Sequence, residues 1–133
     1  MQYSARVVER VINPTNAGSM DENDPEVGVG LVGAPSCGDV LMLYLRIREG
    51  KIIDARFKTF GCGSAIAASQ LATEKLLGTD ASAPFDNLNQ ELFEYLGLPP
   101  VKWHCSVLAK EAVDAAIDNY MQKSRPANSI CAA

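Results

Sequence analysis

The chain has 133 residues, of which 47% are hydrophobic and 21% charged, and its 12 Lys and Arg against 16 Asp and Glu give a net charge of −4. These values are typical of one folded globular domain and exclude a largely disordered chain. The acidic balance argues against a nucleic-acid partner, and the longest apolar run, Val40–Leu45, is too short to span a membrane.

The first third of the chain predicts a helix, a long loop and a strand. Apolar residues within 7–12 recur at helical spacing, and Asn13-Pro14 ends that helix. Residues 13–26 are rich in Asn, Asp, Gly and Pro, which indicates a loop. A short Gly-interrupted strand is expected at 27–32, followed by a turn at 33–38.

Two alternating segments follow. The first begins at Asp39 and places on one face Leu41, Leu43, Leu45 and Ile47. After a turn at Gly50-Lys51, the second places on one face Ile53, Ala55, Phe57 and Thr59. Because each segment also has a polar face, we predict an antiparallel hairpin with one side buried.

The second half predicts helices. Ser64 is a suitable N-cap for a helix ending near Leu77, a short helix is expected at 89–96, and a last helix starts near Cys105. The last helix has an apolar stripe made of Ala109, Val113, Ile117, Tyr120 and Met121. We therefore expect one α+β domain at 1–124, a small antiparallel three-stranded sheet with helices packed on one face, and a flexible tail at 125–133.

Four cysteines are too few for a disulfide-built secreted domain. The segment Met1–Ile12 lacks the uninterrupted apolar core of a secretory signal. We therefore expect a reducing compartment, in which thiols serve as ligands or nucleophiles more often than as staples.

Three of the cysteines occupy similar junctions. Cys37 lies in a Gly/Pro turn before a strand, Cys62 lies between two glycines before a helix, and Cys105 lies at a helix start. A helix N-terminus favours the thiolate form. Each cysteine alone is better explained as a small buried hydrophobe, but three in such junctions favour a ligand role. Cys131, in the predicted tail, is expected to be dispensable.

Two polar residues accompany these thiols. Asp39 lies two residues after Cys37, and His104, the only histidine, precedes Cys105. Asp39 has an alternative interpretation as a turn or strand-start carboxylate with local backbone hydrogen bonds, and His104 is equally consistent with a helix-cap side chain. Thiolates with one imidazole and one carboxylate suit Zn²⁺ or an iron–sulfur unit and not Ca²⁺ or Mg²⁺.

Three long motifs then carry a resemblance over roughly residues 3–123. They are GAPSCGDV at 33–40, FKTFGCGSAIA at 57–67 and LPPVKWHCS at 98–106. In this order they resemble the IscU/NifU-type iron–sulfur cluster assembly scaffold. The resemblance implies the IscU/NifU N-terminal fold and a scaffold, not an enzyme, on which a transient [2Fe–2S] cluster is built from Fe²⁺ and desulfurase-derived sulfur.

The resemblance also implies roles for residues. Cys37, Cys62 and Cys105 would be the sulfur ligands, with Cys105 as persulfide acceptor, Asp39 keeping the cluster releasable and His104 near the site. A segment made of Leu98, Pro99, Pro100, Val101 and Lys102 would bind a heat-shock chaperone and its J-protein. Zn²⁺ can occupy the same ligands.

Further partners implied by the resemblance are a cysteine desulfurase, a frataxin-like protein, a ferredoxin and apo iron–sulfur proteins. The expected location is the mitochondrial matrix or a mitochondrion-derived organelle, with bacterial cytoplasm as the alternative. From the residues alone, 98–102 would be a rigid connector that favours extended polyproline geometry.

Two other functions compete with the scaffold. A zinc-bound sulfur acceptor of the SufU type is disfavoured, because such proteins usually carry an insertion between the second and third cysteines and the segment Gly63–His104 is short. A cysteine-nucleophile enzyme built on Cys105 and His104 is disfavoured, because adjacent helix residues are expected to point in different directions.

Two surface features have no assigned role. Basic side chains gather on the hairpin at Arg46, Arg48, Lys51, Arg56 and Lys58. They indicate a solvated sheet face, or else a docking strip for an acidic partner such as the frataxin-like protein or the ferredoxin. Trp103 stands where the family usually has an aliphatic residue, and either packs beside the site or shields it from water.

Overall fold

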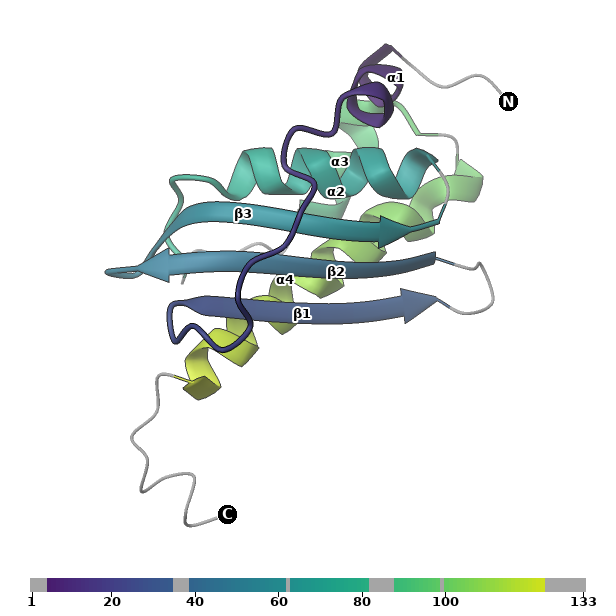
Figure 1. Ribbon diagram of the computed structural model, residues 1–133. Coiled ribbons are helices and arrows are strands. Elements are labelled where there is room, and N and C mark those ends of the chain that lie inside the picture. The colour runs from purple at the N-terminus through teal and green to yellow at the C-terminus, as the bar shows by residue number, and fades with distance from the viewer. Residues whose placement is uncertain (1–4, 35–38, 62, 82–87, 99, 124–133) are drawn as a thin grey trace.

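The computed structural model describes residues 5–34, 39–61, 63–81, 88–98 and 100–123 (Figure 1). Its elements, in chain order, are α1 (Ala5–Ile12), β1 (Val27–Ala34), β2 (Asp39–Arg48), β3 (Lys51–Phe60), α2 (Gly63–Leu76), α3 (Leu88–Leu96), the 3₁₀ turn η1 (Pro100–Lys102) and α4 (Trp103–Lys123). The predicted tail 125–133, with Cys131, lies outside the described residues.

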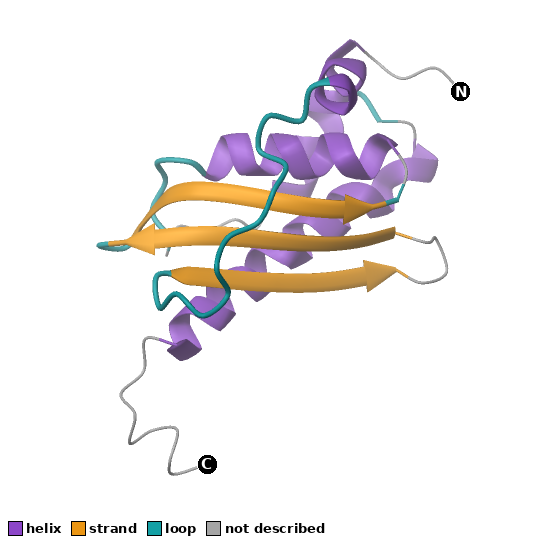
Figure 2. Cartoon of the chain, in the orientation of Figure 1, coloured by secondary structure: helices purple, strands orange, loops and turns teal. Residues whose placement is uncertain are grey.

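The three strands form one antiparallel sheet in the order β1-β2-β3. The helices α2 and α4 pack on one face of this sheet, with α3 against α4 and α1 against α2 (Figure 2). Apolar side chains between the layers, including Leu41, Leu43, Leu45 and Ile47, are buried. The predicted α+β architecture is therefore confirmed.

The prediction that Ile53 shares the buried face of β3 with Ala55 and Phe57 is wrong. Ile53 is 44% exposed and Ile52 is fully buried. The strand register shifts between Arg46↔Asp54 and Ile47↔Ile52, so a β-bulge leaves Ile53 without an opposite residue. Alternation therefore changes phase at the start of β3, and only the residues from Ala55 onward follow the prediction.

The seat of α4 on β1 depends on two glycines. A Cβ atom at Gly30 would lie 2.3 Å from the Ala112 carbonyl oxygen, and one at Gly28 would lie 2.1 Å from the Ala116 carbonyl oxygen. Only glycine permits this approach of helix to strand. The close seat fixes the position of the whole of α4, with Cys105 near one end and Lys123 at the other.

Two details of the helices differ from the predictions. Met121 ends the predicted apolar stripe of α4 but is exposed. Ser64 is not the N-cap of α2, because the helix already includes Gly63. Helix ends are commonly displaced by one residue, but here the shift changes the surroundings of the Ser64 hydroxyl.

The predicted loop 13–26 crosses the sheet face opposite the helices (Figure 1). It pairs with the edge of β3, where the Gly18 amide donates to the Phe57 carbonyl at 2.8 Å. Further along, Asp24 and Glu26 form ion pairs with Arg46, at 2.9 and 3.1 Å. The loop thereby runs from the last residues of β3, beside Phe57, to the opposite end of the sheet, where Arg46 lies.

These ion pairs change the interpretation of the basic strip on the hairpin. Arg46 and Arg48 are bound by carboxylates of the chain's own loop, and Arg56 lies 3.2 Å from Asp54. Charges neutralised in this way steer a distant partner weakly. A solvated sheet face with internal ion pairs therefore explains these three arginines better than a docking strip.

Candidate functional site

The segments that carry the three motif cysteines meet at one end of the sheet. Cys37 lies between Ala34 and Asp39, which are directly paired across β1 and β2. Cys62 follows β3, whose last residue, Phe60, pairs with Val40 of β2. Cys37 and Cys62 themselves lie outside the described residues, and Asp39 is described only as the backbone position that opens β2. The strand pairing nevertheless brings their flanks together.

The third cysteine reaches the same end through α4. A cavity of about 380 Å³ is lined by Gly33 at the end of β1 and by residues from the first turns of α4, namely Trp103, His104, Val107, Leu108 and Glu111. The end of β1 and the start of α4 therefore face one space. The predicted gathering of three cysteine-bearing segments is consistent with this arrangement of their described neighbours.

Cys105 is buried, with 1% of its surface exposed, and lies beside His104. The Cys105 Sγ and His104 Nε2 atoms are 3.5 Å apart. The expectation that these adjacent side chains point apart is wrong, because their side chains turn toward each other at the first turn of α4. A thiol and an imidazole at this distance can exchange a proton or share a metal ion.

Trp103 packs at the edge of this cavity. Its ring meets that of Phe93 on α3 in an edge-to-face contact, with centroids 5.0 Å apart and planes at 77°. The side chain remains partly exposed. Both predicted roles, packing beside the site and shielding it, are compatible with this position.

The segment Leu98–Lys102 is more folded than predicted. Leu98 is buried in the core, and Pro100–Lys102 form the turn η1 that runs directly into α4. The expected polyproline geometry is therefore wrong for 100–102, because the fixed φ of proline also suits the first turn of a helix. Pro99 and the Val101 side chain lie outside the described residues.

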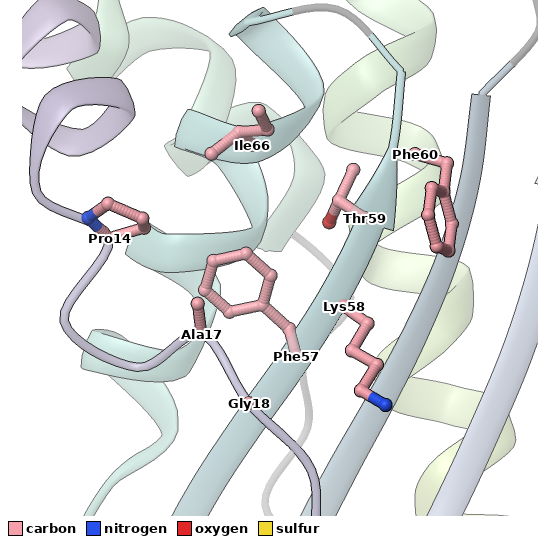
Figure 3. A pocket seen from close by; sticks show the side chains of 8 residues that line it. All are labelled: Pro14, Ala17, Gly18, Phe57, Lys58, Thr59, Phe60 and Ile66. Carbon is pink, nitrogen blue, oxygen red and sulfur yellow. The ribbon is translucent and has the colours of Figure 1, made fainter.

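A larger groove, of about 500 Å³, lies beside the site and differs from it chemically. Figure 3 shows Pro14 and Ala17 of the loop facing Phe57 and Thr59 of β3 and Ile66 of α2. Its lining includes no His, Cys, Asp or Glu. Of these two cavities, only the smaller one has potential metal ligands in its lining, His104 and Glu111.

Sequence reasoning missed the state of the Ser64 hydroxyl. Ser64 is fully buried in the first turn of α2, and its Oγ makes no hydrogen bond. A serine just after Cys62-Gly63 was interpretable only as a cap, since nothing local predicts that the hydroxyl is left unsatisfied.

Within the described ranges, no three His, Cys, Asp or Glu side chains are grouped closely enough to hold a metal ion. Two of the three predicted sulfur ligands lie outside those ranges. No helix in the same part of the chain is long and apolar enough to cross a membrane.

The fold defines a class of small α+β domain, with one three-stranded antiparallel sheet and helices packed on one of its faces. The family model described as "NifU-like N terminal domain" matches residues 2–127, so the chain belongs to that family. This family assignment agrees with the resemblance drawn from the three motifs.

Named relatives are similar over most of the chain. The "Iron-sulfur cluster assembly scaffold protein IscU" of Azotobacter vinelandii is 51% identical, over 92% of this chain and 97% of the relative. The "Iron-sulfur cluster assembly protein 3" of Arabidopsis thaliana is 53% identical, over 95% of this chain and 74% of the relative. Bacterial and plant relatives are thus about equally similar.

Solved structures confirm the fold. A putative iron–sulfur cluster assembly scaffold protein for the SUF system from Fervidobacterium islandicum has a TM-score of 0.69 and 20% identity, covering 86% of this chain and 96% of its own. The N-terminal part of a NifU-like protein from Brucella abortus has a TM-score of 0.64 at 20% identity, covering 92% and 95%.

Proposed function

We propose that this chain is a scaffold on which a [2Fe–2S] cluster is assembled and from which it is passed to apo-proteins. The observation that supports the proposal is that described neighbours of the three motif cysteines lie at one end of the sheet, where the Cys105 Sγ lies 3.5 Å from the His104 Nε2. The family and the named relatives support the same role. The chain is a carrier and not an enzyme, because it is loaded and emptied.

Cys37, Cys62 and Cys105 are the proposed sulfur ligands, with Asp39 or His104 in the fourth position. Clusters that are kept for electron transfer are usually held by four thiolates. A carboxylate is a harder and poorer partner for a soft cluster, so a site with three thiolates favours release. Fe²⁺ is substrate here, and Zn²⁺ binds the same thiolate and imidazole ligands as a competitor.

Cys105 is also the proposed acceptor of persulfide sulfur. Its thiolate attacks the outer sulfur of a donor persulfide, the donor's S–S bond breaks, and the donor cysteine leaves as a thiolate. His104, beside Cys105, is positioned to take the thiol proton. Because Cys105 is almost fully buried, a donor reaches it only if the first turn of α4 shifts.

The proposed partners follow from this chemistry. Sulfur comes from a cysteine desulfurase, electrons from a ferredoxin, and a frataxin-like protein acts at the assembly stage. A heat-shock chaperone with its J-protein would bind 98–102, where Leu98 is buried and Pro100–Lys102 lead into α4. Such binding would require the segment to leave the core, and this would also disturb Cys105.

The relatives are compatible with a mitochondrion or a bacterial cytoplasm. We propose the mitochondrial matrix or a mitochondrion-derived organelle for this chain, with the bacterial cytoplasm as the alternative. Fractionation of the source cells, followed by detection of this chain with an antibody, would distinguish the two.

The experiment that tests the scaffold is anaerobic reconstitution with Fe²⁺, cysteine and a desulfurase, followed by Mössbauer and visible absorption spectra. The parent chain is expected to give a [2Fe–2S] spectrum, and Cys37→Ser, Cys62→Ser and Cys105→Ser are expected to give none. Cys131→Ser is the matched control and should behave as the parent. Desulfurase stimulation with tightly held zinc and no cluster would favour the SufU-type alternative.

A further inference from the structure

One buried hydroxyl in the described part of the chain has no hydrogen-bond partner. Ser64, in the first turn of α2, is 0% exposed, and its Oγ neither donates nor accepts. The other orphaned side-chain atom there is Arg10 Nε, but the same guanidinium bonds Glu74 and the Arg6 carbonyl through its remaining nitrogens. Buried polar groups are almost always paired, so Ser64 requires an explanation.

Other buried hydroxyls in the same helices are satisfied locally. On α2, Ser69 donates to the Ala65 carbonyl at 2.7 Å, and on α4 Ser106 donates to the Trp103 carbonyl at 2.7 Å. A helical serine normally bonds the carbonyl three or four residues earlier in this way. For Ser64, those residues are Gly61 and Phe60, which precede the helix, and neither accepts its proton.

The position of Ser64 in the chain places this residue at the cysteine end of the sheet. Ser64 is two residues after Cys62 and four after Phe60, which pairs with Val40 next to Asp39. It also lies in the first turn of a 14-residue helix, whose unpaired backbone N–H groups favour negative charge at that end. A sulfur anion is the negatively charged group that the motif cysteines would bring to this place.

We propose that the Ser64 hydroxyl donates a hydrogen bond to a sulfur of the nascent cluster, and that it thereby prolongs the time for which the cluster is held. The inference rests on the proposed scaffold function. A sulfide or thiolate sulfur accepts a hydrogen bond from the O–H group. Hydrogen bonds to sulfur help to set the reduction potential of a cluster. The hydroxyl has no partner until sulfur is present. The lower stability caused by burying it unpaired is therefore linked to its role in holding the cluster.

The test compares Ser64→Ala with Ser69→Ala, a buried serine on the same helix whose hydroxyl is fully used. Both variants and the parent are reconstituted anaerobically with Fe²⁺, cysteine and a desulfurase. Four quantities are measured: the melting temperature of the apo-protein, the cluster half-life, its reduction potential and its iron–sulfur stretching frequencies by resonance Raman.

Ser64→Ala should leave the apo melting temperature unchanged or raise it, because an unpaired buried hydroxyl is removed. Its cluster should have a more negative potential, shifted stretching frequencies and a half-life shorter by roughly tenfold, the effect of one charge-assisted hydrogen bond. Ser69→Ala should lower the melting temperature of the apo-protein and leave the reduction potential of the cluster unchanged.

A Ser64→Ala cluster with the parent's potential, frequencies and half-life would overturn the inference, whatever the melting temperature. A parent chain that forms no cluster would contradict the proposed function, and the inference would fall with it. A parent that forms a normal cluster, together with an indistinguishable Ser64→Ala variant, would overturn the inference alone.

Discussion

The two ends of the sheet are built in opposite ways. At the end away from the cysteines, Arg46 and Arg48 bind carboxylates of the crossing loop, and the Lys123 ammonium donates to the Val27 carbonyl at 2.7 Å. At the cysteine end, Phe60 is 71% exposed, and the buried Ser64 hydroxyl is unsatisfied. Ion pairs hold the first end together, whereas at the cysteine end one buried hydroxyl has no partner.

This contrast indicates a division of labour within a small domain. Regions that bind and release ligands are drawn from the less stable parts of a protein, and strain or unpaired groups there must be offset elsewhere. Here the ion pairs and the anchor of the α4 end lie far from the proposed site. The two ends can therefore be changed separately, and the following predictions use that separation.

The largest expected effect is a loss of stability when the packing of α4 on β1, which supports both ends of the sheet, is disturbed. Gly30→Ala should lower the free energy of unfolding by about 3 kcal/mol, since its Cβ would lie 2.3 Å from the Ala112 carbonyl oxygen and force α4 off β1. Urea unfolding measures this. Gly50→Ala is the control, with φ of +79° and no atom within 4 Å of the added Cβ, and should cost about 1 kcal/mol. An equal loss of unfolding free energy in the two variants would contradict the close packing of α4 on β1.

A change confined to the cysteine end should alter cluster release and not stability. Asp39→Ala should slow transfer of the cluster to an acceptor by roughly tenfold, or about 1.4 kcal/mol, because a weakly bound and exchangeable group is removed from a soft cluster. The acceptor's spectrum reports the transfer rate, and urea unfolding should match that of the parent. Transfer at the parent's rate or faster would exclude the proposed role of Asp39.

A change confined to the paired end should alter stability and not the cluster. A hydrogen bond from the Glu26 amide, with Arg46 beside it, holds the pKa of Asp24 below its ordinary 3.8, and Arg48 does the same for the Glu26 pKa, ordinarily 4.5. Depressed carboxylate pKa values stabilise the folded state above the ordinary pKa, and this contribution is lost as pH falls through and below 3.8–4.5.

Arg46→Gln should therefore have a lower melting temperature than the parent at pH 7, and the gap should narrow as the pH falls toward 3. Both side chains of each pair are partly exposed, so salt should narrow the gap as well. Cluster half-life should equal that of the parent. A gap that widens on acidification would contradict the pairing.

The smallest expected effect concerns Trp103. Trp103→Leu removes the edge-to-face contact with Phe93 and should lower the free energy of unfolding by about 1 kcal/mol. If Trp103 also excludes water, the cluster of this variant should decay faster in aerobic buffer. An unchanged decay rate would leave Trp103 with a packing role only.

Local patterns predicted the elements of the fold well. The alternation from Leu41 to Ile47 and the stop at Asn13-Pro14 depend on neighbours in sequence, and both were confirmed. Ile53 was misplaced because a β-bulge is decided by cross-strand register and not by the strand's own pattern. The pairing of Arg46 with Asp24 was missed for a similar reason, since it joins residues that are 22 positions apart.

The site was predicted by residue identity and not by geometry. The three cysteine motifs are visible in the sequence, and strand pairing brings the described flanks of Cys37 and Cys62 together. The contact between Cys105 and His104 was missed because it depends on side-chain rotamers, which the position of a residue on a helix does not determine. The Ser64 hydroxyl was missed because the absence of a partner is a property of the whole packing.

The most direct test of the central claim is cluster transfer from the reconstituted chain to an apo-ferredoxin, followed by circular dichroism in the visible range. The account predicts that the scaffold's [2Fe–2S] signal decays while the ferredoxin signal rises with the same rate constant. A chain that stimulates the desulfurase but holds only zinc, and leaves the ferredoxin without a cluster, would contradict the account.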